Sequence, residues 1–134
     1  MARSFQENQD YLNALSRFGK DLARRSGSSC EICSTSGVSL SVFEVPPGDD
    51  PPAYESCAFL CDTCRGQIET PRQRDAQHWR CLTSSVWSEV PAIQVLSVLM
   101  LRAFAEKESW ASEVVADLYL EPEVETWLET ARLP

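Results

Sequence analysis

Basic side chains and long apolar segments are both scarce in this sequence. Lys and Arg total 12 against 20 Asp and Glu, so the formal net charge is -8. Proteins that bind nucleic-acid phosphates or anionic membrane surfaces need many cations, and this charge balance argues against both classes. The longest apolar segment, residues 91–105, is interrupted by Gln94, Ser97 and Arg102. It is shorter than the ~20 residues that cross a bilayer, so it predicts a buried core helix.

The first residues lack the apolar segment of a secretory signal, which favours a cytoplasmic location. Thiols stay reduced in that compartment, so the six cysteines are expected to be metal ligands or buried thiols rather than disulfides. The sequence also contains neither a glycine-rich phosphate loop nor a nucleophile elbow. With 43% hydrophobic and 24% charged residues, the composition is that of a folded globular protein.

An amphipathic helix is predicted over residues 5–25, within a first segment that spans residues 1–28. Apolar side chains recur at positions 11, 15, 18 and 22, a helical spacing that places them on one face. Ser4 and Glu7 have the spacing of a capping box at the start of this helix. Gly27 suits its end, because glycine adopts the left-handed conformation at low cost.

The second predicted segment, residues 29–70, contains two Cys-x-x-Cys pairs. Two strand-like runs, residues 40–45 and 56–60, lie between the pairs and predict an antiparallel hairpin. Prolines at positions 46, 47, 51 and 52 remove backbone donors from the connection. The connection is therefore expected to be a stiff, exposed loop.

A metal site is predicted with the ligands Cys30, Cys33, Cys61 and Cys64. Two pairs joined by a hairpin give four thiolates in a tetrahedron, which is the coordination of closed structural Zn²⁺ sites. Such a site has no open position for water, so its ion is not expected to act as a Lewis acid. The spacing does not distinguish zinc from iron. A redox role for the thiol pairs is the less favoured alternative, because no βαβ pattern surrounds them.

Three further residues carry reactive groups: Cys57, His78 and Cys81. Strand parity places Cys57 on the face of Cys61 and thus near the metal, but a buried thiol is the favoured interpretation. Cys81 is interpreted as an inert core cysteine, with a reactive thiol or a second metal ligand as the less favoured alternative. A catalytic or ligand role for His78, the only histidine, is the less favoured alternative. The four tryptophans are expected in packing, because none is interleaved with a basic run.

The third predicted segment, residues 71–134, is a connector followed by a helical region. Pro91 and Pro122 suit the first turns of helices, and Ser109 suits a helix cap. The predicted fold class is therefore α+β: an N-terminal helix, a small antiparallel zinc ribbon with four cysteines, and a helical C-terminal part packed on it. A homodimer through the apolar helix at residues 91–104 is an alternative to its burial in a core.

Several blocks of the sequence, in this order, resemble the PhnA zinc-ribbon family, whose name comes from association with alkylphosphonate-utilisation genes. The blocks are residues 22–27 (LARRSG), 30–33 (CEIC), 42–47 (VFEVPP), 61–64 (CDTC), 78–82 (HWRCL) and 87–95 (WSEVPAIQV). The resemblance implies a zinc ribbon with the same four cysteines as ligands, and it establishes no activity. Many longer members carry a small SH3-like barrel after the helical region, and this sequence shows no such strand-rich segment.

The function expected from these features is that of a non-enzymatic, structural-zinc-binding PhnA-like protein, a protein interaction or regulatory module. A partly exposed tryptophan is the expected anchor for a protein partner. One alternative is an enzyme of phosphonate or related small-molecule metabolism, which requires a cleft near His78, Arg80 and Cys81. The other is a nucleic-acid-binding zinc ribbon, for which affinity falls steeply with salt.

Overall fold

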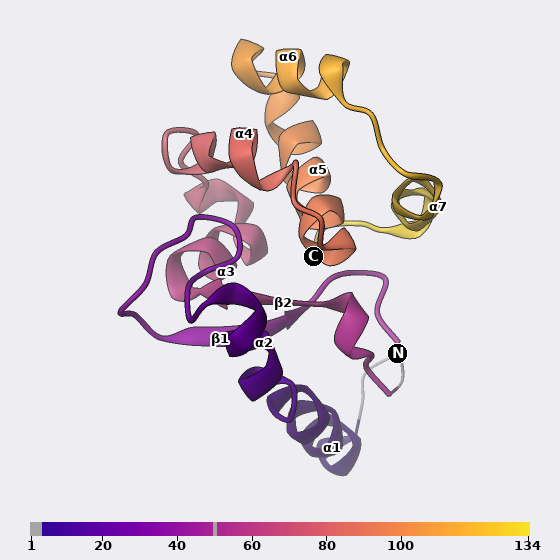
Figure 1. Cartoon of the computed structure of the whole chain (residues 1–134). Coiled ribbons are helices and arrows are strands. Elements are labelled where there is room, and N and C mark those ends of the chain that lie inside the picture. The colour runs from indigo at the N-terminus through magenta and orange to yellow at the C-terminus, as the bar shows by residue number, and fades with distance from the viewer. Residues whose placement is uncertain (1–3, 50) are drawn as a thin grey trace.

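A two-stranded antiparallel sheet joins the two cysteine pairs in the computed structural model, which describes residues 4–49 and 51–134. Strand β1 (Leu40–Glu44) pairs with β2 (Cys57–Cys61), so that Leu40 lies opposite Cys61 and Glu44 opposite Cys57. Helices precede and follow this hairpin, and the predicted α+β fold class is confirmed. Figure 1 shows α1 and α2 on one side of the sheet and α5 on the other.

The segment for which the sequence predicts one N-terminal helix forms two, α1 (Phe5–Ser16) and α2 (Gly19–Ser26). The prediction of a continuous helix is wrong at residues 17 and 18. There the backbone N–H of Phe18 donates to the carbonyl of Leu15 at 3.0 Å, which is the tighter i−3 pattern. Gly19 follows directly. Because glycine has a low helix propensity, interrupting the helix at this point costs little free energy.

The break lets both helices contribute to one small core. Leu15 of α1, Leu22 of α2 and Cys57 of β2 form a buried cluster beneath the sheet. Ser4 caps α1, since its hydroxyl accepts a hydrogen bond from the backbone N–H of Glu7 at 3.1 Å. Gly27 ends α2 with φ at +65°, in the left-handed region that the sequence predicts for it.

Alternate residues of β2 face two different cores. Cys57 and Phe59 pack against the cluster of α1 and α2, whereas Ala58 and Leu60 belong to the larger core on the opposite face. This alternation follows from the two-residue period of a strand, in which neighbouring side chains point to opposite faces. The hairpin is therefore covered on both sides, and its apolar side chains are withdrawn from water.

The helical region continues directly from the hairpin. Helix α3 (Asp62–Glu69) is followed by the short helices η2 (Pro71–Gln73), η3 (His78–Cys81) and α4 (Leu82–Ser85). Then come the three helices that the sequence predicts, α5 (Pro91–Ala105), α6 (Ser109–Asp117) and α7 (Pro122–Thr130). Pro91 and Pro122 both occupy first helical positions, where a missing N–H costs nothing.

Helix α5 is the centre of the larger core. Its residues are buried on most sides, and it packs against β2, α4, α6 and α7. The same core includes Ile32, Cys61 and Cys64, so the hairpin and the helices share one apolar interior. The apolar run at residues 91–105 thus forms a core helix. Within the described part of the chain, no helix combines the length and apolarity needed to cross a bilayer.

The proline-rich connection between the strands is only partly the exposed loop that the sequence predicts. Pro47 and Pro51 are exposed, but Pro52 is buried. The indole N–H of Trp127 in α7 donates to the carbonyl of Pro46 at 2.8 Å. The loop is held because α7 returns from the far end of the chain to cover it, a contact that local sequence does not specify.

Arg25 and Glu31 form an ion pair that fixes α2 to the first cysteine pair. The guanidinium donates to both carboxylate oxygens, at 2.9 and 2.7 Å, and to the carbonyl of Cys57 at 2.8 Å. The backbone N–H of Phe59 also donates to Glu31 at 2.9 Å. The two side chains are only 18% and 6% exposed, so their charges interact with little screening by water.

Arg25→Ala is expected to destabilise the protein strongly. The substitution leaves the buried Glu31 carboxylate without its cation, and removing one partner of a buried pair costs roughly 3–5 kcal/mol. The free energy of unfolding in urea measures the effect. Arg24→Ala is the matched control, because its pair with Asp21 is 68% and 60% exposed and an exposed pair contributes about 0–1 kcal/mol. Equal, small losses in both variants would contradict the role of the buried pair.

Candidate metal centre

The first cysteine pair lies in a tight turn that follows α2. Its backbone is closed by two hydrogen bonds, from Cys30 N–H to the carbonyl of Thr35 and from Ser34 N–H to the carbonyl of Cys30, both 2.9 Å. Ser34 adopts the left-handed conformation with φ at +67°. This turn directs the side chains of Cys30 and Cys33 toward the same side, as the Cys-x-x-Cys spacing predicts.

The second pair lies where β2 passes directly into α3. Cys61 is the last residue of the strand and the N-cap of the helix, and its sulfur accepts a hydrogen bond from the backbone N–H of Cys64 at 3.4 Å. Unpaired N–H groups and the helix dipole favour negative charge at such a position. The strand–helix junction therefore provides a backbone donor for the sulfur of Cys61.

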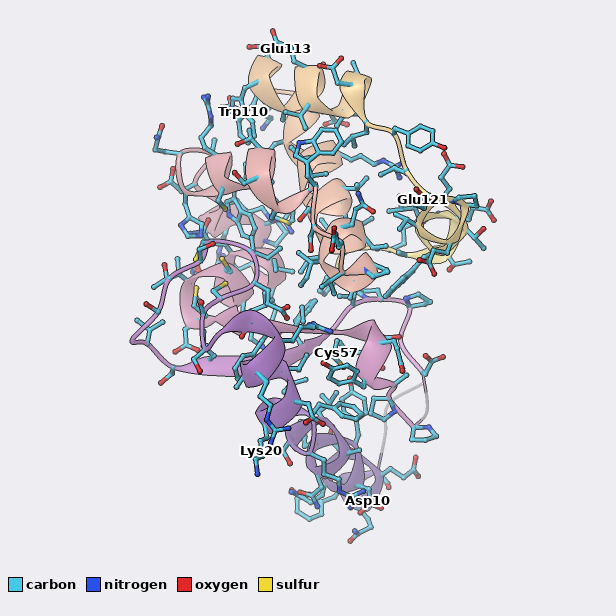
Figure 2. The ribbon with its side chains drawn as sticks, in the orientation of Figure 1. Asp10, Lys20, Cys57, Trp110, Glu113 and Glu121 are labelled. Atoms are coloured by element: carbon cyan, nitrogen blue, oxygen red, sulfur yellow. The ribbon has the colours of Figure 1, made fainter. Side chains whose placement is uncertain are left out.

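The four sulfurs of Cys30, Cys33, Cys61 and Cys64 form one group, the sulfur cage, in which all ligand atoms lie within 4.8 Å of one another. The Cys30 and Cys64 sulfurs are 3.8 Å apart, and those of Cys33 and Cys61 are 3.7 Å apart. A tetrahedral ion with Zn–S bonds of ~2.3 Å requires sulfur–sulfur distances of about 3.8 Å. All six cysteines are free thiols. Figure 2 shows sulfur atoms gathered beside α3.

The crowding of these sulfurs shifts their acidity in opposite directions. The hydrogen bond between Cys30 and Cys64 lowers the pKa of Cys30 to about 4 and raises the pKa of Cys64. The reason is that the Cys64 thiol keeps its proton and donates a hydrogen bond to the Cys30 thiolate. Burial raises the pKa of Cys61. Four thiolates this close repel one another, so their full ionisation needs a cation between them. The donor set fits a soft or borderline divalent ion, such as zinc or iron.

Two polar side chains contact the sulfur cage from outside. The imidazole Nε2 of His78 lies 3.3 Å from the sulfur of Cys64, and the hydroxyl oxygen of Thr35 lies 3.2 Å from the sulfur of Cys33. Both groups can donate a hydrogen bond to a thiolate. Outer contacts of this kind orient metal ligands and tune their charge.

His78 reaches the cage because η3 is anchored to α3. Trp79, the next residue, is fully buried, and its indole N–H donates to the side-chain oxygen of Gln67 in α3 at 2.7 Å. Sequence spacing contains no signal for this contact, since His78 follows Cys64 by 14 residues through an irregular segment. The interpretation of His78 as structural, rather than catalytic, thus missed its position beside a cage sulfur.

The other two cysteines lie outside the cage. Cys57 begins the five-residue strand that Cys61 ends, so strand geometry separates them by about 13 Å despite their shared parity. It is fully buried, its sulfur lies 3.3 Å from the carbonyl of Ala53, and burial raises its pKa to about 12. Cys81 packs against the larger core, and burial raises its pKa to about 12 as well. The interpretation of Cys57 as a buried thiol is confirmed.

The enzyme alternative requires a cleft near His78, Arg80 and Cys81, but these side chains contact different partners. His78 contacts the cage, whereas the guanidinium of Arg80 lies over the ring of Trp110, 4.9 Å from its centroid. Cys81 is a partly buried thiol with a raised pKa, which is the opposite of an activated nucleophile. These three groups therefore do not form the arrangement that nucleophilic catalysis needs.

Comparisons of the chain with protein-family models, with curated proteins and with solved structures find no match. The resemblance to the PhnA family therefore stays a prediction. The functional inference depends on this chain's own residues, above all on the sulfur cage and the groups that contact it.

His78→Ala is expected to weaken zinc binding by the sulfur cage. The substitution removes the imidazole nitrogen beside Cys64, and loss of an outer-shell partner lowers metal affinity on the order of 10–100-fold. Competition for zinc with a chromophoric chelator measures the change. Arg80→Ala is the control, because Arg80 belongs to the same short helix but contacts Trp110. The same affinity in His78→Ala as in the unmodified protein would exclude a role for the histidine.

Proposed function

We propose that this chain is a PhnA-like protein that binds one structural Zn²⁺ through Cys30, Cys33, Cys61 and Cys64 and acts as a non-enzymatic interaction or regulatory module. The observation that carries the proposal is the sulfur cage itself, with two sulfur–sulfur distances of 3.8 and 3.7 Å. Both equal the edge of a zinc–thiolate tetrahedron, about 3.8 Å.

A structural role for the ion follows from the number of its ligands. Four thiolates fill all four positions of a tetrahedral ion, which leaves no place for a substrate or an activated water. The ion then contributes folding energy, because it holds together segments that the unfolded chain leaves apart. The thiols must stay reduced to bind it, which agrees with the expected cytoplasmic location.

Four of the blocks that carry the PhnA resemblance supply, contact or support the cage, which supports that part of the proposal. Residues 22–27 and 30–33 are joined by the ion pair of Arg25 and Glu31. The block at residues 78–82 supplies His78, which contacts the cage. These blocks are separate in the sequence, but each supplies or positions part of one metal centre.

An exposed aromatic side chain supports an interaction role. Trp87 is 53% exposed, contrary to the packing role that the sequence analysis assigns to all four tryptophans. It follows α4 in a turn, where its backbone N–H donates to the carbonyl of Ser84 at 3.1 Å. A large rigid side chain held at the surface buries much apolar area against a partner at little entropic cost.

The arginines weigh against the nucleic-acid alternative, because several of them are occupied within the fold. Arg25 pairs with Glu31, Arg65 donates to the carbonyl of Val42, and Arg74 donates to the carbonyls of Gln67 and Ile68. Phosphate recognition needs cations free to replace counterions, and the net charge of -8 opposes it further.

Purified protein is expected to contain one zinc ion per chain, coordinated by four sulfurs at ~2.3 Å. Elemental analysis gives the stoichiometry, and X-ray absorption at the metal edge identifies the ligands and separates zinc from iron. Structural zinc contributes roughly 10–16 kcal/mol in small peptides, so a strong chelator should unfold residues 29–70, seen as faster amide exchange.

Cys61→Ser is expected to lose the ion, because it removes one vertex of the tetrahedron. Cys81→Ser is the matched control and should keep one ion per chain. Absence of stoichiometric metal from reduced, metal-replete protein, or loss of metal in Cys81→Ser alone, would overturn the proposed site.

A protein partner is expected to depend on both the ion and Trp87. Affinity capture from native lysate should retain a partner on zinc-loaded protein and lose it on metal-stripped protein. Trp87→Ala should reduce the retained amount at unchanged zinc content, since hot-spot aromatics contribute about 2 kcal/mol or more. Tyr119→Ala is the control, because Tyr119 is also exposed, at 77%, but follows α6. Retention that is equal in all four samples would contradict the interaction role.

A further inference from the structure

The four cysteines of the sulfur cage are buried to different extents. Cys30, Cys61 and Cys64 are buried, with 2%, 5% and 0% of their surface exposed, whereas Cys33 is partly exposed. A hollow of about 410 Å³ lies beside the cage, and both Cys33 and Cys61 line it. One edge of the tetrahedron therefore faces a space large enough for several water molecules or a small reagent.

Most residues that line this hollow are polar. Ser39, Asp62 and Thr63 line it together with His78. Ser39 is exposed, so this part of the hollow opens to solvent. Small polar molecules can therefore reach the sulfur of Cys33 without displacing any part of the core.

We infer that Cys33 is a modification site, at which the thiolate attacks a hydroperoxide or a small electrophile and the ion is then released. This inference rests on the proposed zinc site, because coordination is what keeps Cys33 a thiolate. It adds a function to that site, since a closed structural ion becomes a redox-sensitive one. The favoured partner of Cys33 is Cys61, whose sulfur lies 3.7 Å away on the same side of the cage.

The chemistry needs a hydroperoxide as the only co-reactant. The Cys33 thiolate attacks one peroxide oxygen, so that an S–O bond forms, the O–O bond breaks, and the departing oxygen takes up a proton. The Cys61 thiolate then attacks the sulfenic sulfur, which forms the S–S bond and expels hydroxide, itself protonated to water. The two sulfurs lose two electrons, and the hydroperoxide is reduced to an alcohol and water. A cage that has lost two of its four thiolates no longer holds a tetrahedral ion.

The other sulfurs are protected either by burial or by a raised pKa. Cys30 and Cys64 are buried, and the Cys64 sulfur is in contact with His78. Cys57 is fully buried in the core beneath the sheet. Cys81 is partly exposed, but its thiol stays protonated because burial raises its pKa to about 12. Reactivity of cysteine requires both thiolate character and access, and among the six cysteines Cys33 best combines them.

The test uses the full zinc-loaded chain and two reagents. Substoichiometric N-ethylmaleimide followed by peptide mass mapping shows which cysteine reacts first, and Cys33 is expected. One equivalent of hydrogen peroxide, with a chromophoric chelator present, should release zinc in step with a disulfide between Cys33 and Cys61. First modification of Cys57 or Cys81, a disulfide between Cys30 and Cys64, or zinc release without change at Cys33 would each overturn the inference.

A variant that narrows the hollow keeps all four ligands in place. Ser39→Trp fills the opening and should slow alkylation of Cys33 and peroxide-driven zinc release several-fold, at unchanged zinc stoichiometry. Ser112→Trp is the matched control on an exposed position of α6 and should change neither rate. Equal rates in both variants would overturn access through the hollow.

The same measurements separate this inference from the proposed zinc site. A chain that binds no stoichiometric zinc contradicts the site and the inference together. A chain that binds one zinc ion but reacts first elsewhere contradicts only the inference.

Discussion

The structure depends on the convergence of four sulfurs that the chain keeps far apart. Cys33 and Cys61 are 28 residues apart, and Cys30 and Cys64 are 34 residues apart, yet both pairs meet at sulfur–sulfur distances below 4 Å. Closing a loop of this length costs conformational entropy, and the four sulfurs also repel one another when ionised. A divalent ion offsets both unfavourable terms. Its bonds to all four sulfurs compensate for the lost entropy, and its charge neutralises half of theirs. The hairpin and the turns around it are arranged to present those sulfurs.

The metal centre and the helical region stabilise one another through a shared interior. Cys64 and Ile68 of α3 belong to the same buried core as α5, so no polar layer separates the cage from the helices. This continuity matters in a chain of 134 residues, because small cores supply little stability without a cross-link or a metal. It also means that a change at the cage can reach distant surfaces, since the core transmits displacement through close-packed side chains.

The charged side chains are divided between internal contacts, which several arginines make, and an acidic surface. Arg25 and Arg65 donate to carbonyl groups of the hairpin, and Arg25 also donates to the carboxylate of Glu31. The surface is left acidic, which agrees with a net charge of -8. Cage thiolates with a divalent ion carry further negative charge, and the contacts from His78 and Thr35 place proton-bearing groups against it. These contacts add to the effect of a bound cation, which full ionisation of the four sulfurs requires.

Local sequence determined the elements and the ligand set, because these depend on neighbouring residues. The two Cys-x-x-Cys pairs, the left-handed Gly27 and the prolines that begin α5 and α7 each act within one turn of chain, and each was predictable. Tertiary structure alone decided the burial of Pro52, the exposure of Trp87, the contact of His78 with the cage and the opening beside Cys33. Each of these features depends on a segment, distant in the sequence, that packs against the residue or leaves it uncovered. The periodicity of the sequence carries no information about such contacts.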